Sequence, residues 1–568
     1  MAGDVLRSLA LLLLFSPQFG SAQDVPPKTA SQDEQVVELK KLQDESDWEG
    51  ILRLVPSVNG SAEQCFYRGL ALSRLKRWEL ARQAFEAGGR IAPTDPRFPR
   101  ELAGALFQLK HLPEAKHSLR KALKLNANDV YAQNFLATLY FMEENIDAAL
   151  KYWNPSQKPV VDQIASSPQP RLRADILDQA FAVAPASQLL VEDFRNTQAW
   201  LDHLKIFPSY RFELRPKPGE QFDLLFHPVE KNGWGKKLDR IFSLVRGIPS
   251  LTASLDLYNL KGQAINLESR ARFDAQKRRA LSEISAPLGG RPAWRGRFYV
   301  DARKENWDLS RSYQRAEPLP GDLRLRRLAA GFELNNRVNW HWEWKGGFEL
   351  SYRDFLNPPS VSSESAGLFT PGVALKYIAS VDKKLWRVPE HRFTLQSSAR
   401  LEAGKLFRGG SQRFAKLQGS LEAEWFPQAM GDDYLVTARF RAGRADGRLP
   451  FDELFIFGLE RDNDLWLRGH IATEDRKRGS GFLGQDYMLW NWEIEKRIYQ
   501  NSFLDLRLGP AVDTGRIYDE DRNFGSGVWL TDLSILLKAR FRKGVTIILS
   551  YGKDLQTGRN ATYTTTSR

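Results

Sequence analysis

Residues 294–302 read WRGRFYVDA, and their side chains alternate between two chemical classes. In an extended strand, successive side chains point to opposite faces. One face then carries Trp294, Phe298 and Val300. The other face carries Arg295, Arg297, Tyr299 and Asp301. Such a strand needs an apolar environment on one side and a polar environment on the other.

The same alternation recurs from about residue 240 to the end of the chain, in segments of about ten residues separated by Gly, Pro, Asn and Asp. It is read in SLTASLDLYN (250–259), INLESRARF (265–273), KLQGSLEAEWF (416–426), LVTARFRAG (435–443) and MLWNWEIEK (488–496). Residues 338–346, VNWHWEWKG, carry the most apolar example. We expect Trp340, Trp342 and Trp344 to face lipid or its interface there, and His341, Glu343 and Lys345 to point inward.

Two architectures satisfy this pattern. In a soluble sandwich, the apolar face meets a second sheet and the charged face meets water. In a closed membrane barrel, the apolar face meets lipid and the charged face lines the interior. Alternation alone does not separate them, but the long strands and the large ions of both signs favour the barrel. We predict an antiparallel transmembrane β-barrel of about sixteen strands over residues 235–568.

Composition agrees with a chain of several domains. The 568 residues are 42% hydrophobic and 27% charged, which is typical of folded proteins. The net charge of +13 is spread among interleaved acidic residues, so a nucleic-acid partner is disfavoured. Beyond the N-terminus the sequence contains no apolar run of transmembrane-helix length.

The first 22 residues have the features of a secretory signal peptide. Arg7 precedes the apolar residues 9–15, and Gly20, Ser21 and Ala22 offer small side chains for cleavage. The single cysteine, Cys65, excludes a disulfide framework and fits a small core residue.

Residues 62–163 divide without gaps into three blocks of 34 residues. Small residues recur at equivalent positions, where two helices would cross closely: Gly69, Ala103 and Ala137 in the first helix, and Ala81, Ala115 and Ala149 in the second. This register resembles the tetratricopeptide repeat, and residues 33–58 look like a degenerate capping repeat. We therefore expect a helical solenoid over residues 33–157, which would bind peptides or protein partners on its concave surface.

Residues 158–231 change character, with the predicted order strand, helix, helix, strand, strand. This order, and the passage TQAWLDHLKIFPSYRFELRPKPGEQFDLLFHPVEKN, resemble the polypeptide-transport-associated (POTRA) domain. A generic α+β linker is the alternative.

Family-level motifs occur in the C-terminal half. LPFDELFIFGLERDNDLWLRGH, followed by QDYMLWNWEIEKRIYQNSFLDLRLGPAVDTGRIYD, resembles the bacterial surface antigen or outer-membrane assembly factor superfamily of BamA/TamA type. Members carry a hydrophobic-Arg-Gly-aromatic tetrad on a loop that folds into the barrel. Here the tetrad reads Leu467, Arg468, Gly469 and His470, with His in the aromatic place.

The resemblance also implies partners for Arg468. Of the family's aromatic-x-Asp-x-Gly motif, this chain has the Asp and the Gly, as Asp513 and Gly515. The strand before the motif offers Glu493 or Glu495 as an inward carboxylate. A guanidinium drawn into the barrel would pair with such a carboxylate and fasten the loop. The chain departs from the family at its C-terminal end, NATYTTTSR, which lacks the C-terminal aromatic residue that barrels of this family commonly carry.

These features imply an outer-membrane protein that assembles, inserts or translocates polypeptides, with client or accessory proteins bound by its periplasmic modules. An exporter of exopolysaccharide or surface lipoprotein is the alternative, since such exporters also join repeats to barrels. A passive porin explains neither module. We expect no enzymatic activity, no cofactor and no metal, since no nucleotide loop, metal-ligand cluster or nucleophile–base set is present in the sequence.

Overall fold

The computed structural model describes residues 33–58, 60–219, 221–231, 251–310, 312, 322–358, 365–407, 412–519, 524–541 and 545–567. The chain divides into two compact units. The first holds Met1–Val160 with Gln188–Val191, and the second holds Val161–Ser187 with Glu192–Arg568. The expected signal peptide and the first residues of the expected barrel, 235–250, lie outside the described residues.

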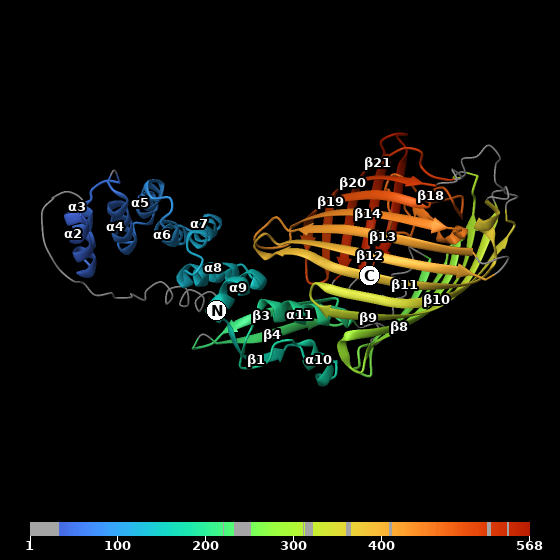
Figure 1. The fold of residues 1–568 in the computed structure, drawn as a ribbon, viewed down its shortest axis with the longest axis horizontal. Helices are drawn as coiled ribbons and strands as arrows, with labels where there is room; N and C mark the ends of the chain where they lie inside the picture. Colours follow the sequence, from blue (N-terminus) through green and yellow to red (C-terminus); the bar gives the residue numbers. More distant parts are fainter. Residues whose placement is uncertain are drawn as a thin grey trace. The chain divides into compact units, whose positions relative to one another are not determined.

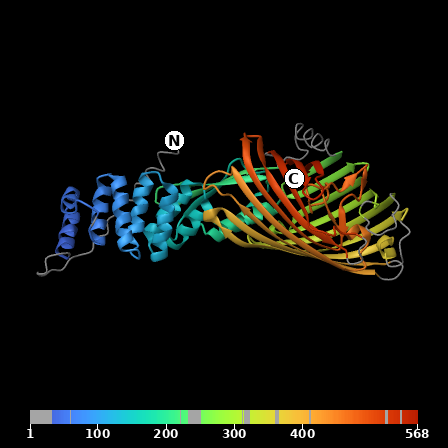
Figure 2. The same ribbon diagram turned by 90° about the horizontal axis from the view of Figure 1, so that it is seen from above.

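The first unit is helical. Figures 1 and 2 show its helices standing side by side in a row. They are α2 (Asp33–Asp44), α3 (Trp48–Leu54), α4 (Ala62–Arg74), α5 (Trp78–Ile91), α6 (Arg97–Gln108), α7 (Leu112–Leu125), α8 (Val130–Met142) and α9 (Ile146–Trp153). Four of these helices are capped by side chains that accept backbone N–H groups, those of Asp47, Ser61, Asp129 and Asn145.

The small residues of the 34-residue register lie where helices cross. Gly69 is buried, and a Cβ atom added to it would lie 2.4 Å from the ring of Phe85 on the next helix. The five alanines at equivalent positions are fully buried: Ala81, Ala103, Ala115, Ala137 and Ala149. Their burial is what the repeat register predicts, and the assignment to the tetratricopeptide family stays a prediction.

The second unit begins with a small mixed domain. A four-stranded sheet has the order β2-β1-β4-β3, and two helices connect its strands (Figure 1). The elements are β1 (Val160–Ser166), α10 (Ala174–Ala180), β2 (Ser187–Gln188), α11 (Val191–His203), β3 (Ser209–Pro216) and β4 (Gln221–Val229). The predicted element order is present, although α10 ends at Ala180, four residues before the end of the helix predicted from LRADILDQAFAVA (172–184).

The rest of this unit is one large antiparallel sheet, and Figures 1 and 2 show it curving round. Among the described residues, fifteen long strands form it. They are β5 (Thr252–Leu260), β6 (Ile265–Phe273), β7 (Lys277–Leu288), β8 (Arg291–Trp307), β9 (Leu323–Asn339), β10 (Trp342–Leu356), β11 (Gly372–Val388), β12 (Phe393–Leu406), β13 (Gln412–Trp425), β14 (Tyr434–Gly447), β19 (Asp486–Gln500), β20 (Leu504–Tyr518), β21 (Leu530–Phe541), β22 (Val545–Asp554) and β23 (Asn560–Ser567).

Ladders of defined register join each strand to the next from β5 to β14, then from β14 to β19 and on to β23. The strand order is that of a closed barrel, in which β23 is followed by β5. Among the described residues, no helix is both long and apolar enough to cross a membrane.

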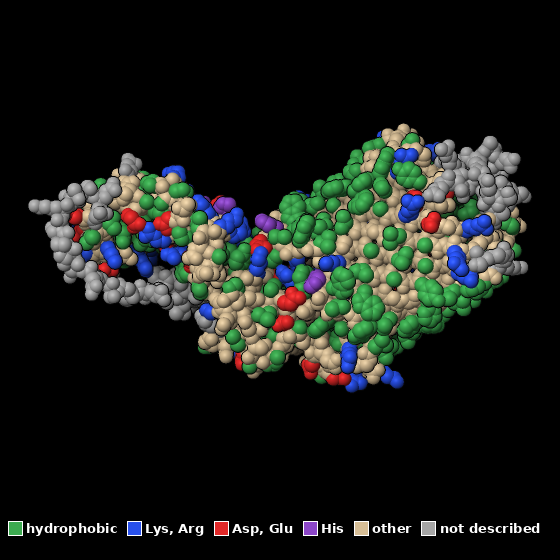
Figure 3. Space-filling view, viewed as in Figure 1, with side chains coloured by type: hydrophobic (Ala, Val, Ile, Leu, Met, Phe, Trp, Pro, Cys, Tyr) green, Lys and Arg blue, Asp and Glu red, His purple; other side chains and the backbone are tan. Residues whose placement is uncertain are grey.

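The two faces of this sheet are inverted relative to a soluble protein. In β8, Phe298 and Val300 on the outer face are exposed, whereas Arg295 and Asp301 on the inner face are buried. Figure 3 shows hydrophobic side chains spread over the outer face of the strands in view. A soluble sandwich would bury the apolar face and expose the charged one. The sandwich interpretation is therefore wrong for this sheet.

The prediction for residues 338–346 is wrong in one respect. The segment is not one strand, because β9 ends at Asn339, Trp340 and His341 form a turn, and β10 begins at Trp342. Trp340 does not face outward as part of a strand. Its backbone N–H donates to Asn196 Oδ1 (2.8 Å) and its indole N–H to Glu192 Oε2 (2.7 Å), both on α11. Period-two alternation continues across a two-residue turn, so the pattern does not reveal the turn.

Helix α11 covers the end of the sheet to which this turn belongs. Trp200 donates to the Arg337 carbonyl (3.1 Å), and His203 Nδ1 lies 2.7 Å from the Pro292 carbonyl. The connection from β14 to β19 leaves the sheet at the opposite end, since alternate connections of an antiparallel sheet lie at opposite ends.

Candidate functional site

Residues 448–485, which we call the inserted loop, connect β14 to β19. They contain a 3-10 helix, η5 (Phe451–Glu453), and the short strands β15 (Phe455–Phe457), β16 (Thr473–Glu474), β17 (Lys477–Arg478) and β18 (Phe482–Gly484). β15 pairs with β18, and β17 pairs with the end of β8 through Arg478 and Trp307. The loop therefore folds back against the inner face of the large sheet.

An apolar core joins the loop to the inner wall at this end of the sheet. Loop residues Phe451, Phe455, Phe457 and Leu467 pack in one buried cluster with wall residues. The wall residues of the cluster include Trp307, Leu323, Leu325, Phe355, Phe414, Tyr487, Leu489 and Ile517. The predicted polar interior is thus apolar at this place, because the loop covers the wall and removes both apolar surfaces from water.

The tip of the loop, residues 467–470, lies against β19 to β22. The Arg468 backbone N–H donates to Asp513 Oδ2 (2.9 Å), and its Nη1 donates to Asp513 Oδ1 (2.5 Å). Its Nη2 donates to Glu493. Arg468 and Asp513 are both buried, at 3% and 0% exposure. The structure therefore brings together Arg468, Asp513 and Glu493, which the family motifs had singled out.

Glu495 and the two glycines have other neighbours. Glu495 pairs with Lys538 (2.7 Å) and Arg540 (2.8 Å) rather than with Arg468. A Cβ atom on Gly469 would lie 2.5 Å from the Asp554 backbone nitrogen. A Cβ atom on Gly515 would lie 2.8 Å from the ring of Phe457 in the loop. Both glycines therefore provide the space that the loop needs to approach the wall.

The tip meets a row of carboxylates that we call the aspartate row. Asp513 on β20, Asp532 on β21 and Asp554 on β22 are direct cross-strand partners. The Gly469 backbone N–H donates to Asp532 Oδ2 (2.6 Å). The His470 ring reaches both remaining carboxylates, with Nδ1 3.1 Å from Asp532 Oδ2 and Nε2 3.5 Å from Asp554 Oδ2. Three consecutive residues of the tip thus face three consecutive strands.

His470, Asp532 and Asp554 are also a group that could offer one ligand atom each to a metal ion, since these atoms lie within 4.8 Å of one another. Both ring nitrogens of His470 already face a carboxylate. The three residues are therefore close together because His470 attaches the loop tip to the wall, and a metal ion is not needed to explain their arrangement.

A row of opposite charge lies on another part of the wall. Arg272, Arg279, Arg303, Arg327 and Arg353 are successive cross-strand partners on β6 to β10, and we call them the arginine row. Like charges directly opposite one another destabilise a sheet. This row therefore needs anions close by.

Acidic residues of the inserted loop supply part of this negative charge. Asp452 lies 2.7 Å from Arg353, 3.3 Å from Arg327 and 3.6 Å from Arg303. Asp462 lies 3.0 Å from Arg272 and 3.2 Å from Arg279, and also 2.8 Å from Lys277. Two loop aspartates therefore cover the whole row.

Two loop carboxyl groups respond to this environment. Burial by itself would raise the pKa of Asp462, but Lys277, Arg279 and Arg272 outweigh it and hold the pKa well below its usual value. Burial would likewise raise the pKa of Glu453, and Lys376, Lys416, Arg327 and Arg353 hold it well below the usual value. Both groups are therefore anionic at neutral pH.

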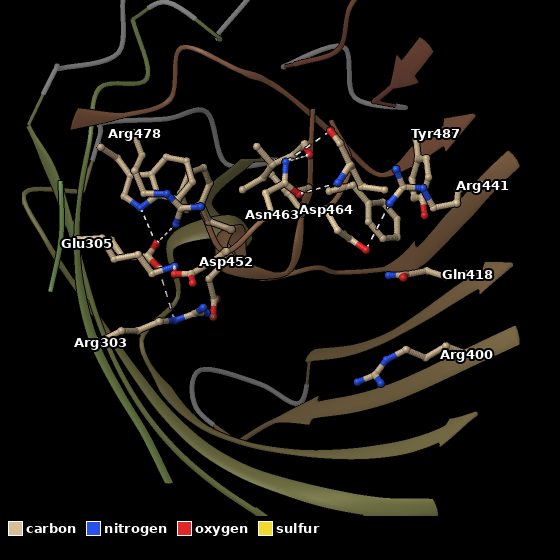
Figure 4. Close-up of a pocket in the computed structure, with 18 of the residues that line it drawn as sticks. Arg303, Glu305, Arg400, Gln418, Arg441, Asp452, Asn463, Asp464, Arg478 and Tyr487 are labelled. Carbon is tan, nitrogen blue, oxygen red and sulfur yellow. Dashed lines mark hydrogen bonds and ion pairs between the residues drawn. The ribbon is translucent and has the colours of Figure 1, made fainter. Parts of the chain in front are cut away.

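In the part of the chain that the structure describes, two polar cavities lie between the loop and α11. One, of about 390 Å³, is lined by residues such as Arg303, Glu305, Asp452 and Arg478, and Figure 4 shows Arg478 turned towards Glu305. The other, of about 400 Å³, is lined by α11 residues such as His203 and by Glu343 and Lys345. Ser398 and Ser420 line both, so the two cavities adjoin at the wall of β12 and β13.

Several site residues were not singled out from the sequence. Asp532 and Asp554 lie at buried, inward positions of their strands, so assigning each strand residue to a face could have marked them as inward carboxylates, whereas Asp513 was found from the family motif. The arginine row could not be found in this way, because the partner of each arginine depends on the register between strands. Asp452 and Glu453 stand within the segment LPFDELF, where nothing in one sequence marks them.

Of three comparisons with known proteins, only the comparison with solved structures found similar proteins. No family model matches the sequence, and no curated protein matches it. BamA from Haemophilus ducreyi lacking POTRA domains 1–3 is 11% identical, with a TM-score of 0.42, covering 72% of this chain and 84% of that one. CdiB from Escherichia coli is 13% identical, with a TM-score of 0.45, covering 70% of this chain and 73% of that one.

CdiB from Acinetobacter baumannii is 10% identical, with a TM-score of 0.42, covering 81% of this chain and 85% of that one. The solved structures to which this chain is similar thus include BamA and CdiB.

Proposed function

We propose that this chain is an outer-membrane β-barrel that assembles, inserts or translocates polypeptides. The observation that carries the proposal is the inserted loop, fastened at its tip to the aspartate row inside a sheet whose apolar face points outward. In this arrangement, the outer face of the sheet would contact the membrane, and the inserted loop is hydrogen-bonded to the inner face of the same strands.

The location in a membrane rests on the inverted faces of the sheet. Exposed apolar side chains on neighbouring strands, such as Phe332, Phe348 and Leu350, would be covered by lipid. A sheet in lipid must also close, because unpaired backbone groups are costly there. The cyclic strand order supports closure between β23 and β5. Because β23 has the polar sequence NATYTTTS, we expect the pairing of β23 with β5 to be the least stable strand pairing of the proposed barrel.

The N-terminal modules would stand in the periplasm. The 34-residue register supports a tetratricopeptide solenoid, and the strand and helix order of residues 158–231 supports a POTRA-like domain. Both would receive client or accessory proteins. Helix α11, which contacts the end of the large sheet, would pass a client from these modules to the barrel.

The fastened loop favours a protein-assembly role over a permanently open pore. Among the described residues, loop residues fill the interior at one end, and two cavities of about 390 and 400 Å³ lie inside the sheet. An exporter of exopolysaccharide or surface lipoprotein is the second candidate, and the polar lining of these cavities supports it. In either case the proposed roles require no enzymatic activity, cofactor or nucleic acid.

Crosslinking in cells tests the proposal. A photoreactive residue placed at exposed Arg77 of the helical unit should capture unfolded outer-membrane or secreted polypeptides, and depletion of this chain should make those same polypeptides accumulate in the periplasm. Loss of a polysaccharide or a surface lipoprotein, with polypeptide assembly unchanged, would establish the second candidate instead.

A further inference from the structure

The arginine row has an unusual arrangement for the wall of a sheet. Arg272, Arg279, Arg303, Arg327 and Arg353 stand opposite one another on five neighbouring strands. Since neighbouring strands lie about 4.8 Å apart, the row extends roughly 20 Å round the wall. Repulsion along it would destabilise the sheet if the guanidinium groups had no anionic partners.

The wall itself provides only part of the compensation. Arg279 pairs with Asp301 (2.8 Å), Arg303 lies 3.6 Å from Glu305, and Arg327 pairs with Glu349 (2.5 Å). Arg272 pairs with Asp274 of its own strand end. Among the ion pairs of the described residues, those of Arg353 are made to loop residues, Asp452 at 2.7 Å and Glu453 at 3.5 Å.

The partners of Arg353 are deeply buried. The Arg353 and Asp452 side chains are each 1% exposed, and that of Glu453 is 4% exposed. A buried cation left without its anion is strongly destabilised. Lys376 and Lys416, on β11 and β13, reach the same loop carboxylate Glu453 at 3.3 Å and 3.4 Å. The wall around η5 is therefore basic, and the loop neutralises it.

We propose that the arginine row is a binding track for the carboxylates of an acidic polypeptide segment, and that the inserted loop is its resident occupant through Asp452 and Asp462. The proposal deepens the proposed function and rests on it, because the incoming ligand would be a client polypeptide. The track takes its ligand when the two loop aspartates leave the guanidinium groups. The occupant seen in the structure is itself a polypeptide that presents aspartates, which favours a peptide over an anionic glycan.

The experiment uses the purified full chain in detergent micelles and a fluorescent peptide of ten glutamates. In the Asp452→Asn/Asp462→Asn variant, both side chains keep their shape and lose their charge. We expect this variant to bind the peptide about tenfold or more tightly than the wild type, with binding that weakens as salt rises. A peptide of ten glutamines should show no such gain.

Two further variants locate the gain. Asp464→Asn removes the same charge from the same loop, but the Asp464 side chain is 86% exposed, so this control should bind like the wild type. Adding Arg327→Gln, in the middle of the row, to the double variant should remove most of the gain. Retained heat-modifiable mobility on gels shows that each variant is folded. If the double variant does not fold, Asp452→Asn alone should show a smaller gain in the same direction.

Equal peptide affinity in the folded Asp452→Asn/Asp462→Asn variant and the wild type would overturn the proposal. So would tight binding of a sulfated oligosaccharide in place of the glutamate peptide, which would assign the track to glycans. Neither result would decide the crosslinking test of the proposed function, because that test measures polypeptide capture by the helical unit.

Discussion

Asp513 on β20 and Asp532 on β21 are direct cross-strand partners, and two consecutive backbone N–H groups, those of Arg468 and Gly469, donate to one carboxylate each. Two buried carboxylates side by side repel one another, and hydrogen-bond donors to each carboxylate offset this repulsion. The tip of the inserted loop provides these donors, and the Arg468 guanidinium adds a positive charge to Asp513. The conformation of the tip and the register of the two strands therefore depend on each other.

Arg468 and Asp513 should show strong energetic coupling. Arg468→Ala leaves the buried Asp513 without its cation, and Asp513→Ala removes the main acceptor of Arg468, so each should lower barrel stability by roughly 3–5 kcal/mol. The double variant should be little worse than either single variant, because both remove the same interaction. Arg468→Lys should restore only part, since an ammonium group lacks the fork geometry. The temperature at which gel mobility shifts measures this, and strictly additive losses would mean that the pair is not coupled.

Gly469→Ala should displace the tip. The added Cβ would lie 2.5 Å from the Asp554 backbone nitrogen, which cannot move without shifting β22, and 2.7 Å from the Asp532 side-chain Cγ. We expect a loss of roughly 1–3 kcal/mol in unfolding free energy. Gly419→Ala is the matched control, because its Cβ would meet nothing nearer than 3.8 Å. Equal stability of the two variants in urea titrations would contradict the close approach of the tip.

The contact between α11 and the sheet should weaken in acid. His203 is 4% exposed, and burial, assisted by Arg337, Arg295 and Lys205, lowers its pKa from 6.5 to about 4. The undocked state then binds more protons than the docked state between these two values. Docking is therefore strongest above pH 6.5 and weakens as the pH falls towards 4.

Hydrogen exchange of α11 in the full chain measures this docking. Exchange should speed up as the pH falls through that window, after correction for the intrinsic pH dependence. His203→Gln should lose this pH dependence, while the exposed His117 replaced by Gln should keep it. A His203→Gln variant with an unchanged pH profile would exclude His203 as the titrating group.

A charged side chain on the outer face of the sheet should lower the free energy of unfolding. Leu350 on β10 is 51% exposed, and lipid would surround it in the proposed barrel. Leu350→Arg should cost about 2–4 kcal/mol near the middle of the bilayer. Ile91→Arg is the control, since Ile91 is 54% exposed on α5 of the helical unit and would face water, where about 0.5 kcal/mol or less is expected. Urea unfolding in lipid vesicles that gave equal effects would argue against a lipid-facing sheet.

Ala115→Leu should destabilise the helical unit. Ala115 is fully buried on α7, so a larger side chain forces the helices apart at a cost of roughly 1–3 kcal/mol. Ala127→Leu, at an exposed position of the same repeat, should leave stability within about 0.5 kcal/mol. Thermal unfolding followed by circular dichroism distinguishes them, and equal melting temperatures would contradict the predicted repeat register.

The sequence by itself determined which face of each strand is apolar and where the helical register repeats. Both are periodic properties of neighbouring residues, so Phe298 and Val300 could be assigned to one face and Arg295 and Asp301 to the other without any coordinates. The Arg468 tetrad and Asp513 were found from a family resemblance, which preserves residues that meet although they stand far apart in the chain. Glu493 and Glu495 remained equivalent at that level, since both occupy the same face of one strand.

Only the tertiary structure decided between such equivalents. Which strand residues stand opposite one another depends on register, and a shift of one residue would move every inward side chain to the outside. The arginine and aspartate rows exist only because five and three strands, respectively, align at one height. Asp452 and Asp462 reach the arginine row because the loop folds back by a path that no local pattern encodes. Long-range register and loop path arise from packing of the whole sheet, and they set which charges meet.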